Sequence, residues 1–181
     1  MLLVFRYKIQ RGPTLPSLDN YFQTEDQHPI DVVEVLAELQ DWDFNRVAED
    51  QITMVIEEQW RTHSITLSWS NYDESLCLIS TYEFDSPKNK VGLLYEALNL
   101  ANEECYGGAF YFWNDKSLIV YRNALALSSG AIVSPDQINR MLETAVSSSE
   151  RFYPAFQLVC WGDRFPKAAM QIAIADGLGH A

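Results

Sequence analysis

The spacing of apolar residues changes along the chain between a helical period and a strand period. Four segments carry apolar residues three and four positions apart, as on one face of a helix. These predicted helices run over Pro29–Gln40, over Pro87–Glu104, from Pro135 to near Gly162, and over Pro166–Asp176. Each segment begins at a proline, which suits the first helical position because its missing N–H would have no partner there. Pro154 lies inside the third segment, where we expect a kink or a break.

Between these helices, apolar and polar residues alternate, as on a half-buried strand. The strands predicted in this way cover Ile52–Trp60, Ile65–Ser70, Leu76–Phe84, Gly108–Trp113 and Ser117–Leu127. Phe44–Ala48 and Met1–Gln10 admit further strands. The order α-β-β-β-α-β-β-α-α favours an α+β fold with an antiparallel sheet of about five strands and flanking helices. Because Gln10–Gln27 is polar and holds two prolines, we expect an N-terminal arm or linker over residues 1–27 and a single domain over 28–181.

The predicted strand Gly108–Trp113 is aromatic on both of its faces. Phe110 and Phe112 share one face, and Tyr111 and Trp113 share the other. Both faces therefore need cover, either from helices and loops of the chain or from a partner. Tyr and Trp are frequent interface anchors. We expect Tyr111 and Trp113 to lie under the N-terminal arm, a second subunit or a bound protein segment.

The predicted helix Pro87–Glu104 carries more apolar surface than one sheet can bury. Beside its main apolar stripe it has a second one, formed by Leu93, Ala97 and Leu100. Such a surplus face is typical of a helix that also packs against another subunit. We therefore predict a homodimer with these three residues in its interface.

Composition and charge exclude several classes of function. The chain has 181 residues, enough for one domain, and 13 basic against 25 acidic residues give a net charge of −12. A field of that sign repels nucleic-acid backbones and anionic lipid surfaces. No run approaches the roughly 20 apolar residues of a membrane-spanning helix. Three scattered cysteines without a CxxC motif favour a reducing cytoplasm over a disulfide framework.

The chemistry-bearing residues form no catalytic pattern. His28, His63 and His180 are too widely spaced for a local metal site, and we expect them at the surface. Cys105 follows a predicted helix, whose negative end raises a thiol pKa, the wrong direction for a nucleophile. The sequence has no G-x-S-x-G, G-x-G-x-x-G or phosphate-binding loop. We expect no catalytic residues, no metal and no cofactor.

Charged residues offer two weaker hypotheses. Asp31, Glu34, Glu38 and Asp41 share one face of the first predicted helix, with no Lys or Arg between them. Such a row is either a solvated face or a docking site for a basic protein segment. Arg151 is a candidate to pair with a buried carboxylate.

Several stretches resemble the YbjN-like family. They are Tyr95–Glu103, Cys105–Gly108, Tyr121–Leu125, and the tail from Glu150–Phe156 through Trp161-Gly162. The resemblance spans about His28 to Asp176, and its members are described as bacterial sensory transduction regulators. It implies a fold similar to that of type III secretion chaperones, which are α+β domains that pair into dimers and bind protein segments. It implies no catalytic residues.

These observations together favour a non-catalytic, dimeric protein-interaction domain, either a regulator or a chaperone-like adaptor. A small-molecule sensor that uses apolar space between sheet and helices is the main alternative, and an enzyme comes third. A closed cavity ringed by polar groups would favour the sensor, and a long open groove would favour peptide binding.

Overall fold

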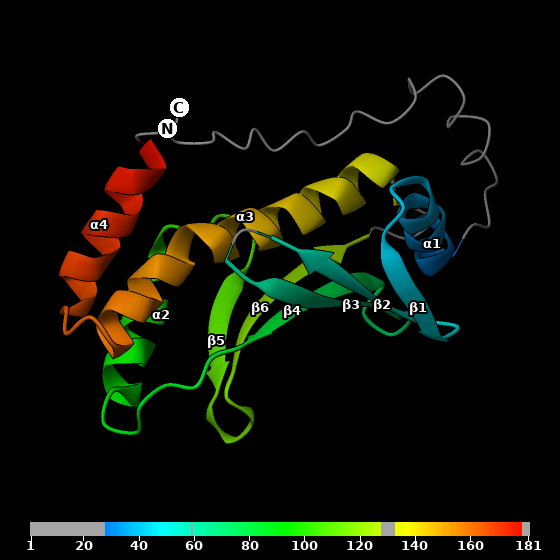
Figure 1. The fold of residues 1–181 in the computed structure, drawn as a ribbon. Coiled ribbons are helices and arrows are strands. Elements are labelled where there is room, and N and C mark those ends of the chain that lie inside the picture. Colours follow the sequence, from blue (N-terminus) through cyan, green and yellow to red (C-terminus); the bar gives the residue numbers. More distant parts are fainter. Residues whose placement is uncertain (1–27, 59, 128–132, 179–181) are drawn as a thin grey trace.

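The computed structural model describes residues 28–58, 60–127 and 133–178 and shows an α+β fold. Its helices are α1 (Pro29–Leu39), α2 (Val91–Glu103), α3 (Pro135–Cys160) and α4 (Pro166–Leu178). Its strands are β1 (Asp43–Ala48), β2 (Gln51–Glu57), β3 (Thr62–Ser70), β4 (Ser75–Glu83), β5 (Ala109–Trp113) and β6 (Leu118–Ala126). The strands form one antiparallel sheet in the order β1-β2-β3-β4-β6-β5 (Figure 1).

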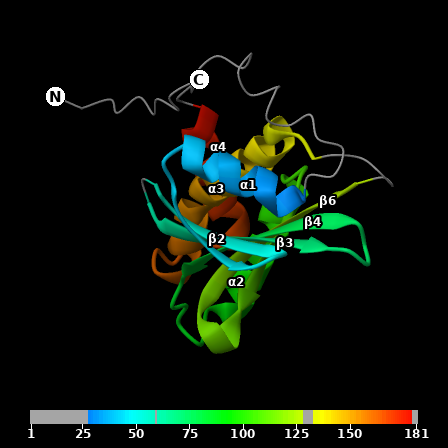
Figure 2. The ribbon, with the colours of Figure 1, turned by 90° about the vertical axis from the view of Figure 1, so that its right-hand side faces the viewer.

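The helices leave the two faces of the sheet in different surroundings. α1 packs on β1, β2 and β3, and the long helix α3 crosses the same face over β4 and β6 (Figures 1 and 2). α2 lies beside β5 and also packs against α3 and α4. The core fills the space between these helices and the inner face of the sheet, where Ile65, Leu78 and Ile119 are fully buried. We call the opposite side the outer face.

The sheet has six strands rather than about five, because Phe44–Ala48 lies within β1 and four strands precede α2. Every second residue of β1 faces the helices, and one of these is Arg46, which turns toward α1. An inward-facing arginine interrupts the apolar alternation that marks a half-buried strand. That interruption is the physical reason why the pattern of residues signals this strand only weakly.

One expectation about prolines is wrong, and of the kink or break expected at Pro154 the structure excludes the break. α2 begins at Val91 rather than Pro87, because the Lys90 N–H donates to the Pro87 carbonyl at 2.8 Å and closes a turn ahead of the helix. α3 runs through Pro154 without a break. Phe152 and Phe156, on either side of this proline, are buried in the core, and their packing offsets the lost backbone hydrogen bond.

Candidate functional site

The outer face changes character from one end of the sheet to the other. On β3 it presents only small hydroxyl side chains, among them Ser64, Thr66 and Ser68. On β5 it presents Tyr111 and Trp113. The alternation predicted for β5 is confirmed, since Phe110 and Phe112 are buried on the inner face.

Tyr111 and Trp113 remain partly uncovered by the described parts of the chain. They are 47% and 38% exposed, and they lie opposite Val120 and Leu118 of β6. The Lys116 ammonium sits 5.3 Å from the centre of the Trp113 ring. Trp113 also lines a pocket of about 500 Å³ together with Tyr95 and the turn Asn114–Lys116. An aromatic ring beside a pocket is the kind of feature that anchors a protein interface.

The second stripe of α2 is largely used inside the chain. Ala97 is fully buried, and Leu93 and Leu100 are partly buried and pack against the core. α3 and α4 both pack on α2, so the chain itself covers much of the surface that the sequence assigned to a second subunit. Of the three residues expected in a dimer interface, only Leu93 and Leu100 keep surface that a partner could touch.

A side chain of α2 closes the edge of the sheet at Phe110 of β5. The Asn102 carboxamide donates to the Phe110 carbonyl at 3.1 Å and accepts from the Phe110 N–H at 2.6 Å. It therefore offers the backbone of β5 the two hydrogen bonds that a neighbouring strand would make. This contact fixes α2 against β5 and satisfies edge groups that would otherwise be open to another chain.

A buried polar network between the sheet and α3 was not anticipated. His63 was expected at a surface turn, but it lies within β3, 1% exposed on the inner face. Its Nε2 is 3.3 Å from Glu150 Oε1, and its Nδ1 is 3.5 Å from Ser80 Oγ. His63 is in phase with Ile65 and Leu67, so a predicted strand extended by two residues would have placed it among core residues. Its partner Glu150, far away in the sequence, carried no such signal.

A second set of polar contacts, centred on the hydroxyl of Tyr153, lies beside this network. The Tyr153 hydroxyl accepts from both Arg61 Nε, at 2.7 Å, and the Arg61 Nη2, and from Gln157 Nε2 at 2.9 Å. Tyr82 packs edge-on against both His63 and Tyr153, and its burial raises the pKa of the phenol well above 10.0. These contacts join β3 and β4 to α3.

Ser80, His63 and Glu150 stand in the order of a hydrolase triad, but their surroundings do not suit catalysis. A nucleophilic serine must reach a substrate carbonyl, but Ser80 is 0% exposed. Its Oγ lies 3.5 Å from Nδ1 of His63, which is long for a hydrogen bond from a nucleophile to its base. The geometry instead satisfies polar groups in the core, which are costly when unpaired. We assign the network to the packing of α3 on the sheet.

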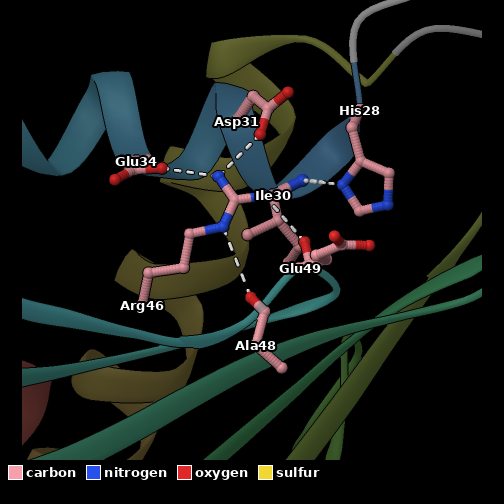
Figure 3. A network of polar contacts seen from close by, with 7 residues as sticks. All are labelled: His28, Ile30, Asp31, Glu34, Arg46, Ala48 and Glu49. Atoms are coloured by element: carbon pink, nitrogen blue, oxygen red, sulfur yellow. Dashed lines mark hydrogen bonds and ion pairs between the residues drawn. The ribbon is translucent and has the colours of Figure 1, made fainter.

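Two of the four carboxylates on the predicted acidic face of α1 pair with an arginine from the strand beside it. Arg46 Nη1 lies 2.7 Å from Asp31 Oδ1 and 2.6 Å from Glu34 Oε2 (Figure 3). Its other nitrogens donate to the carbonyls of Ala48 and Glu49. Both carboxylates raise the pKa of the Arg46 guanidinium. Asp31 and Glu34 are therefore already paired, whereas Glu38 and Asp41, the other two residues of the predicted acidic face, are exposed.

The remaining candidates take ordinary structural places. The His28 ring caps α1 by accepting from the Ile30 N–H at 3.3 Å, and His180 lies outside the described residues. Burial raises the pKa of the Cys105 and Cys160 thiols. Arg151 lies over the Phe152 ring, and its neighbour Glu150 is the residue that makes the buried polar contact.

Neither a metal-binding cluster nor a membrane-spanning helix is found in the part of the chain that the structure describes. Within residues 28–58, 60–127 and 133–178, no three His, Cys, Asp or Glu side chains gather closely enough to hold a metal ion. None of the helices among these residues combines the length and apolar character needed to cross a bilayer.

The fold and the outer face define an α+β domain built on an open antiparallel sheet. Residues 29–158 match the model of the YbjN family, described as "Putative bacterial sensory transduction regulator". The chain belongs to the YbjN family, as the resemblance in its sequence implied.

Two solved structures are similar to this one at low sequence identity. One is the "Crystal structure of YbjN, a putative transcription regulator from E. coli", with 10% identity, a TM-score of 0.51, and 71% of this chain and 90% of that chain covered. The other is the "Structure of the HopA1-SchA Chaperone-Effector Complex", with 17% identity, a TM-score of 0.48, and coverage of 68% and 91%. A search of curated protein sequences finds no match.

Proposed function

We propose that this protein is a non-catalytic adaptor or regulator that binds other protein chains in the cytoplasm and does so as a homodimer. The observation that carries the proposal is the aromatic pair Tyr111 and Trp113, exposed on the outer face beside a pocket. Both residues offer apolar area with a polar group at the edge of the ring, which suits a surface that is covered on association. The family description as a regulator supports the same class of function.

The outer face is suited to a second protein for a further reason. On the outer face, Tyr111 and Trp113 are followed by Val120 of β6 and by Ile79 and Thr81 of β4, and the Ser and Thr side chains of β3, such as Ser64 and Thr66, lie beyond these strands. A polar rim around a small apolar centre is the usual anatomy of a protein interface. The net charge of −12 disfavours nucleic acid as the partner.

A second candidate function rests on another pocket. A hollow of about 360 Å³ lies where β6, the Gly107 turn and the first turns of α3 meet. Asn123, Asp136 and Arg140 line it alongside the apolar side chains of Leu125 and Met141. Such a mixture of polar and apolar groups suits a small polar molecule. Native mass spectrometry that finds a bound small molecule in the purified protein would favour this sensing function.

Replacement of Trp113 with Ser tests the proposed interface. We expect the change to weaken association, with a second copy or with a partner, by about 2 kcal/mol or more, because a partly exposed anchor is lost. The free energy of unfolding should change little. Sedimentation velocity and light scattering at micromolar concentrations measure the first quantity, and urea denaturation measures the second.

Trp60→Ser is the matched control, since Trp60 is 48% exposed but lies far from β5 in the turn before β3. It should leave association unchanged. A Trp113→Ser protein that unfolds, yet binds normally per folded molecule, would show that Trp113 serves the core. Leu93→Glu tests α2 separately, and a variant that stays dimeric removes Leu93 from the interface. Only monomer in the unmodified protein would refute the homodimer.

A further inference from the structure

Helix α4 is apolar on two sides, and the described parts of the chain cover only one of them. Ala169, Met170 and Ala173 are buried where α4 packs on α2 and α3. A second row of apolar residues, which we call the α4 stripe, is exposed and consists of Phe165, Ala168, Ile172 and Ala175. Phe165 directly precedes α4, and its carbonyl accepts from the Ala169 N–H at 3.0 Å, so it stands in phase with the helix. Figure 1 shows α4 at the margin of the molecule. A helix with apolar residues on two sides is ordinarily covered on both.

The α4 stripe alternates large and small side chains along the helix. Phe165 is 76% exposed and Ile172 is 41% exposed, and each is followed by an alanine of the stripe. If the stripe of a second copy runs antiparallel, with a two-fold axis at the level of Met170, Phe165 of each copy lies opposite Ala175 of the other. Ile172 of each copy then lies opposite Ala168 of the other. Every large side chain meets a small one, and the same surface serves both copies, as a two-fold contact requires.

The charges at the start of α4 favour the antiparallel orientation. Arg164 and Lys167 are exposed, and the first turn of α4 holds no acidic residue. In a parallel pair of α4 helices these cations would lie beside the same cations of the second copy and repel them. In an antiparallel pair, Arg164 of each copy lies near the last turn of the other α4, where the helix dipole is negative. Charge and side-chain size therefore select the same arrangement.

The position of α4 in the fold explains why the exposed apolar surface lies there. α4 packs on α2, the helix whose second apolar stripe the sequence assigned to a dimer interface. It thereby contributes to covering α2 and exposes an apolar stripe of its own. α4 also lies beyond residue 158, where the match to the family model ends.

We propose that two copies of this protein pair through the α4 stripe, antiparallel and across a two-fold axis at the level of Met170. The proposal rests on the homodimer of the proposed function and assigns its interface. Tyr111 and Trp113 lie on β5, outside this interface, and remain for other protein chains.

Two single variants of the full chain test the interface. Ile172→Glu and Ala168→Lys each place two charges in the pair of stripes without partners, and each should raise the dissociation constant of the dimer about thirtyfold or more. Light scattering over a range of concentrations measures this constant. When the two variants are mixed, the new Lys of one chain lies opposite the new Glu of the other, and native mass spectrometry should find a heterodimer.

The matched control is Leu39→Glu. Leu39 is 45% exposed at the end of α1, on the other side of the molecule from α4 in Figure 1, and its replacement should leave the dimer intact. An Ile172→Glu protein that dimerises as tightly as the unmodified chain would overturn the α4 interface and leave the homodimer standing. Only monomer in the unmodified protein would overturn both. Variants that stay monomeric after mixing would overturn the antiparallel arrangement.

Discussion

Two adjacent glycines, Gly107 and Gly108, differ sharply in what a side chain would meet. A Cβ on Gly108 would lie 2.5 Å from the Tyr121 ring and hydroxyl and 2.7 Å from the Arg122 carbonyl oxygen. A Cβ on Gly107 would lie 3.6 Å from the nearest atom, a methyl of Thr144, which is an ordinary contact. Gly108 therefore needs to be a glycine because its backbone lies against β6, and Gly107 does not.

Gly108→Ala should lower the free energy of unfolding by about 2 kcal/mol or more, because Tyr121 is fully buried and the Arg122 oxygen belongs to the sheet backbone. Gly107→Ala is the control and should change it by less than about 0.5 kcal/mol. Urea denaturation followed by tryptophan fluorescence measures both. Equal effects of the two changes would contradict this steric account.

At the scale of single residues, some features of the structure could be predicted from the sequence, but the polar contacts between distant residues could not. The predicted strand Ile65–Ser70 stopped short of His63, which was expected at the surface, and nothing local indicates that Glu150 of α3 comes to meet it. Arg46 likewise pairs with carboxylates of α1 only because the chain folds β1 under that helix. Contacts between distant residues depend on packing, which a periodic pattern does not contain. The alternation of β5, in contrast, depends on strand geometry alone and was predictable.

At the scale of elements, helix starts were predictable where capping groups accompany the proline. α3 begins at Pro135 with Ser134 as its cap: the Ser134 Oγ accepts from the Gln137 N–H, and the Gln137 side chain accepts from the Ser134 N–H. Pro87 has no such companion and belongs to a turn instead. A proline alone does not distinguish a helix start from a turn, since its fixed φ suits both.

Loss of that cap should be measurable in the stability of the whole domain. Ser134→Ala removes a partner of a backbone N–H at the start of α3 and should lower the free energy of unfolding by about 1 kcal/mol. Ser147→Ala, on the exposed side of the same helix, should have almost no effect. Thermal denaturation followed by circular dichroism compares the two, and an unchanged Ser134→Ala protein would show that the cap contributes nothing.

For the whole molecule, the class of fold followed from the order of helices and strands, but the distribution of its surfaces did not. The second apolar stripe of α2 indicated surplus surface correctly, yet α4 and α3 cover much of it within the chain. A sequence pattern shows that a face must be buried. It does not show whether the cover comes from the same chain or from another.

Asn102→Ala tests how the sheet ends at β5. The change frees both backbone groups of Phe110, and we expect two such edges to pair across a two-fold axis, giving a species of twice the original mass. Asn99→Ala, one turn earlier on the exposed side of α2, should leave the mass unchanged. Light scattering over a range of concentrations measures it. An Asn102→Ala protein that is less stable but unchanged in mass would show that α2 shields this edge without its asparagine.

The Asn102 contact has a consequence for growth of the sheet beyond a single molecule. A subunit with one free edge behaves as a chain terminator, since pairing consumes that edge and the reaction stops. A subunit with two free edges behaves as a bifunctional monomer and polymerises without limit. Asn102 limits such growth at the β5 end of the sheet, because it occupies both backbone groups of Phe110.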